Sequence, residues 1–344
     1  MRVLHWYSNF LGGGGVANAV LGLARAQAEL GAEVAIACAA IQGKPLYQTM
    51  ENLLENIQIF RFLPKWKFKF GNLMLRQIPR ESIEIMRNFN PDVVHVHGEF
   101  NLDNWHVPKI FNAPIILSPH GAFHPVVLRK SKRKAKIVYV AVARRFLYGR
   151  VHAFHALSPA EARHIQALLG SVNVYTLPQG ASLYVAKSLD IAKRSEQRND
   201  EIRFIFVGRL DAYTKGLDIL LEAFAQAVKS LRNKDLHLNL VGPDWKGSLV
   251  RLKDMAHKLD CASRVTFTGA MSGERVAKFL MQSDVYVHLS RHEGFPLSIA
   301  EALLAGKPAI LSREIGLVTY PEIASLPHVK VIAPEKDEAT SAMI

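Results

Sequence analysis

Two glutamates and the start of a helix follow one predicted strand in the C-terminal half of the chain. Glu293 comes after an apolar run at residues 285–289, and Glu301 lies eight positions further on, about one turn inside the predicted helix. Pro296 suits the first turn of that helix because its missing N–H is not needed there. Backbone N–H groups within residues 294–297 can then point at an anion, beside both carboxylates. A charged helix face is the competing explanation for the carboxylates alone.

Two cations occupy the loop after another buried strand, expected over residues 204–208. Arg209 and Lys215 lie in this loop, and a helix follows them. Open α/β sheets bind ligands at the carboxyl ends of parallel strands, which is where the loop falls. The Arg209 guanidinium can grip a phosphate with a fork of N–H donors, whereas Lys215 acts as a point charge. Two solvated surface cations are the alternative.

A glycine-rich turn follows the first predicted strand, and a helix begins directly after Gly14 and Gly15. Glycines at such a turn let backbone N–H groups approach a phosphate, although they can also serve geometry alone. The spacing is not G-x-G-x-x-G, and no acidic residue closes the next strand, at residues 34–38. The turn therefore disfavours a nicotinamide cofactor.

His120 lies in a Ser-Pro-His-Gly segment at the end of a strand expected over residues 115–118. A histidine there can hydrogen-bond a sugar hydroxyl, stabilise a phosphate, or serve structure alone. His95 and His97 alternate on the strand expected at residues 92–97, which is more typical of core or strand-end histidines than of ligand contacts.

Short apolar runs alternate with longer amphipathic ones in both halves, which predicts an α/β fold with two parallel sheets. The remaining predicted strands are at residues 3–7, 34–37, 57–62, 153–157, 236–241, 265–268 and 309–311, and the predicted helices are at 16–30, 217–230, 249–259 and 274–282. A polar stretch with little apolar periodicity separates the halves. The predicted organisation is an N-terminal domain at residues 1–180, a linker at 181–201 and a C-terminal domain at 202–344.

Composition restricts the class of protein. A chain of 344 residues with 49% hydrophobic content is long enough for two cores. Its two cysteines, Cys38 and Cys261, support neither a disulfide framework nor a cysteine metal site. The N-terminus lacks the apolar stretch of a signal peptide, and no segment has the roughly 18 apolar residues of a spanning helix. A reducing, cytoplasmic location is expected.

The net charge of +13 is unevenly distributed. Residues 1–177 hold 21 Lys+Arg against 10 Asp+Glu, whereas residues 178–344 hold 22 against 20. Ten basic and no acidic residues lie between Asn104 and Ala160, and six of the ten fall within residues 129–136. Such a field attracts polyanions.

Together these segments resemble glycosyltransferase family 4, retaining enzymes with the GT-B fold, in which two Rossmann-like domains face each other across a cleft. The resemblance covers nearly the whole chain and is most specific over residues 207–308. It implies a catalytic set in which Arg209 and Lys215 neutralise the diphosphate, Glu293 contacts the transferred sugar, and His120 touches that sugar from the opposite domain. The donor-binding residues that it implies are Gly14, Gly15, Gly294, Phe295, Pro296, Leu297 and Glu301, the last on the ribose.

The implied reaction moves a hexose-type sugar from a nucleotide diphosphate sugar to a glycan or lipid-linked acceptor, with retention of anomeric configuration. Cell-surface polysaccharide or glycolipid synthesis is the expected setting. Two cations and a helix N-terminus stabilise the leaving group, so no metal or other cofactor is expected, and no Asp-x-Asp pair is present to hold one.

Three segments depart from the family pattern. Residues 177–182 replace the usual Pro-Asn-Gly turn, residues 313–317 lack the usual paired glycines, and the sequence stops at Ile344, where relatives usually continue. These departures leave three alternatives open: a different interdomain turn, a truncated C-terminus or a hinge built differently, and reduced activity.

Acceptors in this family are bound mainly by the N-terminal domain, which here carries the excess charge. Basic and aromatic residues interleave near residues 62–70, and a basic run follows at 129–136, which suits an anionic membrane or a lipid-linked acceptor. The residues expected at this surface are Lys65, Trp66, Lys67, Arg129, Lys130, Lys132, Arg133 and Lys134. The alternative near residue 65 is a strand with one apolar and one solvated face. If the surface binds a membrane, the expected location of the protein is peripheral, at the inner face of that membrane.

Two rival classes stay open at this point. A nucleic-acid-binding protein would explain the charge, but no helix-turn-helix, zinc or RNA-binding signature accompanies it, so no nucleic-acid partner is expected. A nucleotide-sugar epimerase or a phosphorylase shares the GT-B fold and some of its phosphate chemistry.

Overall fold

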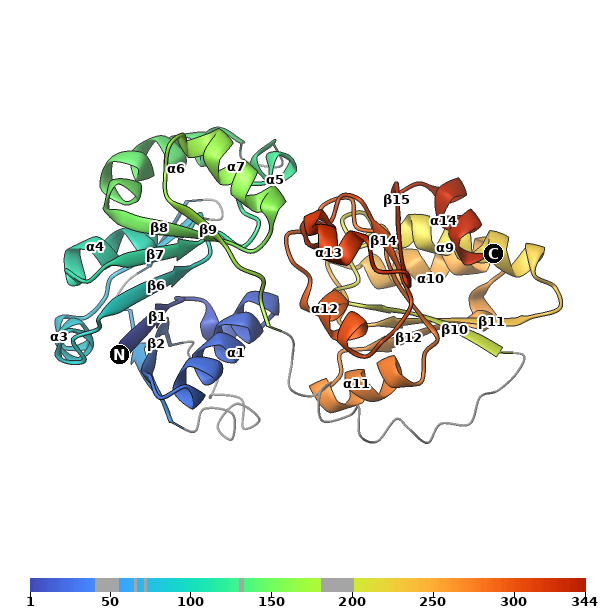
Figure 1. The fold of residues 1–344 in the computed structure, drawn as a ribbon, viewed down its shortest axis with the longest axis horizontal. Coiled ribbons are helices and arrows are strands. Elements are labelled where there is room, and N and C mark those ends of the chain that lie inside the picture. Colours follow the sequence, from blue (N-terminus) through green and yellow to red (C-terminus); the bar gives the residue numbers. More distant parts are fainter. Residues whose placement is uncertain (41–55, 65–66, 71–72, 130–132, 181–200) are drawn as a thin grey trace. The chain divides into compact units, whose positions relative to one another are not determined.

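A computed structural model describes residues 1–344 except 41–55, 65–66, 71–72, 130–132 and 181–200. The chain forms two compact units, Met1–Gly180 and Ala181–Ile344. Each unit is built around its own parallel sheet (Figure 1). The linker expected at residues 181–201 lies almost wholly outside the described residues.

The sheet of the first unit has seven parallel strands in the order β3-β2-β1-β6-β7-β8-β9. The strands are β1 (Arg2–Trp6), β2 (Glu33–Ala39), β3 (Ile57–Phe62), β6 (Val93–His97), β7 (Ile115–Ser118), β8 (Val151–Ala156) and β9 (Val174–Thr176). The chain adds strands on one side of β1 and then returns to its other side with β6. The strand order therefore reverses between β1 and β6, and such a switch point opens a crevice at the carboxyl ends of the strands.

Helices cover both faces of this sheet, as expected for strands that are buried on both sides. They are α1 (Gly15–Glu29), α3 (Arg80–Asn88), α4 (Val107–Ile110), α5 (Pro125–Arg129), α6 (Arg133–Phe146) and α7 (Pro159–Leu169). On one face, Val20 of α1 packs with Phe10 and Ile36. The larger core on the other face includes Trp6 and Phe62, whose rings stack. Gly31 follows the C-cap of α1. Its φ of 86° lies in the left-handed region that a glycine after a helix adopts.

A small antiparallel hairpin interrupts the alternation after β3. Its strands are β4 (Lys67–Phe70) and β5 (Leu73–Arg76), and Lys67 pairs with Arg76. Residues 62–70 are therefore not one continuous strand, because β3 ends at Phe62 and the chain turns out of the main sheet.

The sheet of the second unit has six parallel strands in the order β12-β11-β10-β13-β14-β15. The strands are β10 (Glu201–Val207), β11 (Asp235–Val241), β12 (Val265–Gly269), β13 (Val285–His288), β14 (Ala309–Ser312) and β15 (Val329–Ile332). The helices are α9 (Leu217–Ser230), α10 (Ser248–Lys258), α11 (Gly273–Met281), α12 (Leu297–Leu304), α13 (Pro321–Ala324) and α14 (Lys336–Met343). Here the strand order reverses between β10 and β13. The two units confirm the predicted fold of two Rossmann-like domains, whereas β9 and β15 were not predicted.

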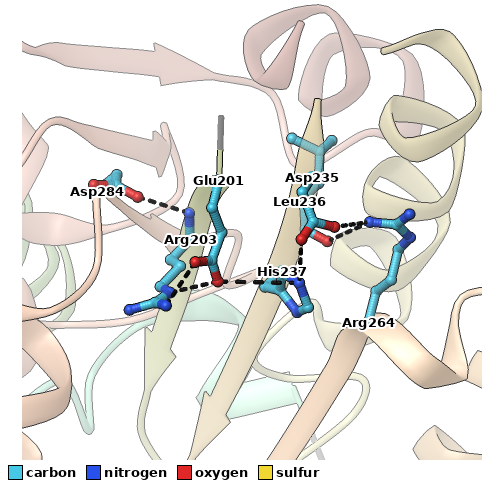
Figure 2. Close-up of polar contacts among 7 residues, drawn as sticks. All are labelled: Glu201, Arg203, Asp235, Leu236, His237, Arg264 and Asp284. Atoms are coloured by element: carbon cyan, nitrogen blue, oxygen red, sulfur yellow. Dashed lines mark hydrogen bonds and ion pairs between the residues drawn. The ribbon is translucent and has the colours of Figure 1, made fainter. Parts of the chain in front are cut away.

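An ion-pair network lies at the amino end of the second sheet (Figure 2). The Arg203 guanidinium donates two hydrogen bonds of 2.7 Å to Glu201, and its backbone N–H donates to Asp284 at 2.8 Å. Arg264 donates to Asp235 at 2.5 Å, and a hydrogen bond with His237 together with this contact lowers the pKa of Asp235. The network ties the starts of neighbouring strands together, at the opposite edge from the loops described next.

Candidate functional site

The predicted chemistry of the second unit gathers around its switch point. β10 leads into the loop with Arg209 and Lys215, and β13 leads into the loop with Glu293. Because β10 and β13 are neighbours and parallel, both loops leave the sheet at the same edge. Ligands in open α/β sheets bind at this place.

Lys215 and Glu293 form an ion pair at this edge, although 78 positions separate them. The Lys215 side chain is 10% exposed and that of Glu293 is 24% exposed. An ammonium that is largely removed from water needs a compensating anion, and Glu293 supplies it. The structure thus places the lysine expected to neutralise a diphosphate in direct contact with the glutamate expected to contact a sugar.

The lysine loop is held by close backbone packing. Gly216 has a φ of 63° and precedes α9, and a Cβ atom there would lie 2.0 Å from the carbonyl oxygen of Leu289. The backbone N–H of Thr214 donates to Asp211 Oδ1 at 3.0 Å. Only glycine fits at position 216, so the two loops around the switch point are locked together.

Arg291 is a positioning residue that the sequence patterns did not single out. Its guanidinium donates two hydrogen bonds to Asp218, at 2.8 and 2.9 Å, and lies 4.3 Å from the Tyr213 ring centroid. Its backbone N–H also donates to the carbonyl of Thr214 at 3.1 Å. Arg291 therefore joins the Glu293 loop to the lysine loop; its position two residues before Glu293 was the available signal.

Arg209 is exposed and stacks on an aromatic ring. Its guanidinium carbon lies 4.1 Å from the centroid of the Trp245 ring. Trp245 comes from the loop after β11, which pairs with the arginine loop through a bridge between Leu210 and Asp244. The stacking holds one face of the guanidinium against the indole ring. The N–H groups at the edge of the guanidinium remain able to bind phosphate. Trp245 was missed because a lone aromatic in a loop carries no pattern.

The segment without the usual paired glycines packs directly on Glu293. The backbone N–H of Gly316 donates to the carbonyl oxygen of Glu293 at 2.8 Å. The backbone N–H of Glu293 donates to the carbonyl oxygen of Glu314 at 3.3 Å. Ile315 forms an isolated bridge with Glu293. Residues 313–317 therefore hold the backbone of the glutamate loop.

Glu301 lies in the second turn of α12, and Ser298 of the same helix belongs to a buried hydrogen-bonded network. Tyr286 donates to Ser298 Oγ at 2.9 Å and is 3.0 Å from His288 Nδ1. Burial raises the pKa of Tyr286, and the charges of Glu301 and Glu293 raise it further. Both carboxylates therefore act on the same buried residue.

The loop between the two glutamates holds the other predicted donor-binding residues. Gly294 and Phe295 are half-buried, and Pro296 is buried at the N-cap of α12. Leu297 is the first helical residue, so the proline precedes the helix instead of opening it. The cap carries no side-chain hydrogen bond. The helix α12 therefore begins one residue later than predicted.

In the first unit, Gly14 and Gly15 follow β1 and lie at that unit's own switch point. Gly14 is the N-cap of α1 with a φ of 92°, and no side chain caps the helix. A Cβ atom at Gly14 or Gly15 would meet nothing within 4 Å. The geometry is that of a turn whose N–H groups can approach an anion.

His120 sits in a strained turn after β7, with a φ of 55°. The carboxylate of Glu161 accepts hydrogen bonds from the N–H groups of Gly121 at 2.5 Å and Leu157 at 2.8 Å, which holds the turn in place. Both ring nitrogens of His120 have neighbours: His97 Nδ1 at 3.1 Å and Gln179 Nε2 at 3.0 Å. A left-handed conformation of a bulky residue is costly and clusters at functional sites.

Three further histidines lie behind this turn. His5, His95 and His97 are buried, and one ring nitrogen of each lies within 4.8 Å of the others, so the group could hold a metal ion. Burial lowers the pKa of all three, that of His5 to about 4. His95 and His97 were expected as core or strand-end residues; the addition of His5 needed the pairing of β1 with β6.

The basic surface predicted for an acceptor or membrane is described only in part. Lys65, Trp66, Lys130 and Lys132 lie outside the described residues. Lys67 is exposed at the start of β4, Arg129 is exposed at the end of α5, and Arg133 begins α6. On α6, Lys134, Ile137, Val138, Arg145 and Phe146 are exposed. The described residues contain no helix whose length and apolar character would let it cross a bilayer.

Comparison with known proteins agrees with this arrangement. A family model described as Glycosyltransferase Family 4 matches residues 13–183, and one described as glycosyl transferases group 1 matches residues 187–341. The chain belongs to the GT4-type glycosyltransferases. The resemblance inferred from the motifs is thereby confirmed.

Related proteins match this GT4-type chain over part of their lengths. The alpha-monoglucosyldiacylglycerol synthase of Streptococcus pneumoniae is 23% identical over 277 residues, which cover 75% of this chain and 60% of the relative. The first three curated relatives are matched over 30%, 60% and 36% of their own lengths.

Solved structures share the fold. A sucrose-phosphate synthase from Thermosynechococcus elongatus has a TM-score of 0.74 at 19% identity, and the match covers 100% of this chain and 88% of that chain. The Anabaena protein HepE in complex with UDP and glucose has a TM-score of 0.71 at 18% identity, with coverage of 100% and 89%. These matches confirm the GT-B fold.

Proposed function

We propose that this chain is a retaining glycosyltransferase that moves a hexose-type sugar from a nucleoside diphosphate sugar to a glycan or lipid-linked acceptor. The observation that supports it most is the contact of Lys215 with Glu293 at the switch point of the second unit. A cation and a carboxylate held together there suit a ligand that carries phosphate at one end and hydroxyls at the other.

The two cations have different tasks in this proposal. Arg209, stacked on Trp245, binds the diphosphate through its planar N–H groups. Lys215 takes the developing charge of the leaving diphosphate, and Glu293, released from the ion pair, accepts hydrogen bonds from the sugar hydroxyls. Glu301 accepts hydrogen bonds from the ribose. Pre-placed charges of this kind stabilise a transition state without reorganisation at the moment of reaction.

Retention and independence of metal are parts of the same proposal. The acceptor hydroxyl attacks on the face that the diphosphate leaves, so no side-chain nucleophile is required. Arg209 and Lys215 neutralise the diphosphate in place of a divalent ion. Transfer activity should therefore be unchanged after treatment with EDTA, and activity that returns only with added Mg²⁺ or Mn²⁺ would contradict this part.

A thermal-shift panel of UDP, GDP, ADP and their sugars tests the proposal. A nucleotide that binds only the native state raises the melting temperature. A sugar donor at a concentration of 100 times its Kd adds about 2.7 kcal/mol to the free energy of unfolding. NMR of the product from the matching donor should show the anomer of the donor retained. Sugar release, epimerisation or a need for inorganic phosphate without any acceptor would favour the epimerase or phosphorylase class instead.

We further propose that the basic surface of the first unit binds an anionic membrane or a lipid-linked acceptor. On α6, cations and apolar side chains are exposed together, with Lys134 and Ile137 one turn apart and Arg145 two turns beyond Ile137. Cations that bind lipid phosphates beside side chains that enter the headgroup boundary are typical of peripheral membrane binding.

Flotation with vesicles tests this surface. The wild-type protein should float with anionic vesicles and stay behind with neutral ones. The variant K134E/R145E should lose flotation, whereas Arg163→Glu, at an exposed position on α7, is the matched control that should keep it. Equal recovery with neutral and anionic lipids would end the proposal.

A further inference from the structure

Five side chains of the first unit form one continuous hydrogen-bonded line that runs from Gln27 through His120 to Gln179. His5 Nε2 lies 2.7 Å from Gln27 Oε1, and His5 Nδ1 lies 2.9 Å from His97 Nε2. His97 Nδ1 lies 3.1 Å from His120 Nε2, and His120 Nδ1 lies 3.0 Å from Gln179 Nε2. The line therefore runs from α1 through β1 and β6 to the strained turn after β7.

The two amides at its ends give this line a direction. A neutral imidazole has one N–H donor and one acceptor nitrogen. Gln27 Oε1 only accepts, so His5 carries its proton on Nε2 and accepts on Nδ1. His97 therefore donates from Nε2 and accepts on Nδ1, and His120 donates from Nε2. The remaining lone pair, on His120 Nδ1, accepts from the Gln179 amide, so both ends require the same direction.

The surroundings keep these rings neutral. His5 and His97 are 0% and 2% exposed. Burial lowers the pKa of His120 to about 3 and that of His97 well below its usual value. Each imidazole therefore stays in the one-donor, one-acceptor form that the line requires.

A second hydrogen-bonded line holds His95 beside the first. The carbonyl of Leu177 accepts from His155 Nε2 at 2.9 Å, and His155 Nδ1 then accepts from the Ser118 hydroxyl at 2.8 Å. Ser118 Oγ in turn accepts from His95 Nε2 at 2.7 Å. The side of the cluster next to β7 and β8 is therefore satisfied without an ion.

We propose that Gln27, His5 and His97 are positioning residues that fix His120 as its Nε2–H tautomer, so that His120 presents Nδ1 as a hydrogen-bond acceptor to a substrate hydroxyl. The substrate part of this inference rests on the proposed function. In the structure Gln179 occupies that acceptor nitrogen, and a substrate hydroxyl takes the place of its amide. His120 is then neither a cation nor a donor from Nδ1, so it contacts a hydroxyl and not a phosphate oxygen.

A metal ion bound by His5, His95 and His97 requires the opposite state. Metal-ligating nitrogens carry no proton, so His5 Nδ1 and His97 Nε2 would both turn lone pairs to the ion. His97 would then donate from Nδ1, and His120 would be forced into the Nδ1–H tautomer. The 2.9 Å hydrogen bond between His5 and His97 and the amide orientations at both ends favour the metal-free line.

Long-range ¹H–¹⁵N correlation NMR of the histidine rings in the full chain tests the tautomer directly. We expect Nε2–H for His5, His97 and His120 between pH 6 and 8, before and after addition of one equivalent of Zn²⁺. An Nδ1–H tautomer or a charged ring at His120, or a stoichiometric zinc-induced change at His5 and His97, would overturn the proposal.

The variant Gln27→Lys distinguishes positioning from general stability. A lysine at this half-buried position donates where glutamine accepts, so every ring in the line reverses and His120 becomes Nδ1–H. Gln27→Glu keeps an acceptor and should keep the wild-type tautomer. Ala26→Lys, at the exposed neighbouring position of α1, is the matched control and should leave all rings unchanged.

The same variants link the tautomer to activity. Reversal in Gln27→Lys should lower the kcat of sugar transfer about tenfold, as expected for the loss of one hydrogen bond. Gln27→Glu should keep a kcat near the wild-type value. Wild-type tautomers in Gln27→Lys would contradict the line itself. The expected tautomers together with an absence of any sugar transfer by the wild type would contradict only the proposed function.

Discussion

At the scale of single residues, Glu293 and Glu301 carry separable tasks. Glu301→Ala should raise the Kd of the nucleotide about tenfold, because the ribose loses a hydrogen-bonded carboxylate. Glu293→Ala should leave nucleotide affinity near the wild-type value and lower kcat about a hundredfold, because a contact to the reacting sugar is lost. Isothermal titration and steady-state kinetics measure the two effects. Unchanged constants in both variants would contradict the assigned roles.

Glu99 is a residue whose burial has a measurable consequence for stability. Burial raises its pKa to about 7 from 4.5, against hydrogen bonds from Tyr139 and Phe100 that lower it. The folded state therefore binds the Glu99 proton more tightly, and the contribution of Glu99 to stability falls as the pH rises from about 4.5 to 7. The full shift corresponds to about 3 kcal/mol.

Glu99→Gln removes this titration. In urea unfolding, the free energy of unfolding of the variant should rise relative to that of the wild type between about pH 5 and pH 8. A parallel pH dependence of the two proteins would show that Glu99 ionises normally in the folded state.

At the scale of elements, the approach of the lysine loop to the end of β13 depends on a missing side chain. Gly216→Ala places a Cβ atom 2.0 Å from the Leu289 carbonyl at a positive φ, so the two loops must separate. We expect a loss of about 3 kcal/mol or more in the free energy of unfolding. Denaturant titration measures it, and the Lys215–Glu293 contact should weaken with it.

Gly247→Ala is the control for the backbone contribution. Gly247 also has a positive φ, of 79°, but a Cβ atom there meets nothing within 4 Å. This variant should cost only about 1 kcal/mol. Equal losses in Gly216→Ala and Gly247→Ala would mean that the contact with Leu289 is unimportant.

At the scale of the whole molecule, the two units should respond differently to acid. The first unit contains several histidines whose pKa burial lowers, including His5 to about 4 and His120 to about 3. Below about pH 6.5 these histidines bind protons in the unfolded chain but stay neutral in the folded unit. The stability of the first unit therefore falls as the pH drops below about 6.5. Each such histidine adds up to about 1.4 kcal/mol of loss per pH unit.

The second unit has fewer such histidines; among its described residues His288 is the only histidine whose pKa burial lowers. Hydrogen exchange followed by mass spectrometry should show protection lost first in residues 1–180 as the pH falls from 7 to 4. Loss of protection in the second unit before the first would contradict the prediction.

The sequence by itself determined the alternation of strands and helices, the restart of that pattern after residue 200, and the family. These depend on hydrophobic periodicity and on local motifs, which are written in consecutive residues. The strand at Val93–His97 and the helix at Leu217–Ser230 lie where the periodicity predicted them. The short edge strands β9 and β15 were missed because almost none of their residues are buried, so neither forms an apolar run.

Only the tertiary structure decided which side chains meet. Lys215 reaches Glu293 because β10 and β13 are neighbours in the sheet, and strand order is not readable from either segment. His5 reaches His97 for the same reason, through the pairing of β1 with β6. Local patterns place chemical groups at the ends of strands, whereas contacts between those groups depend on long-range packing, which a single sequence does not display.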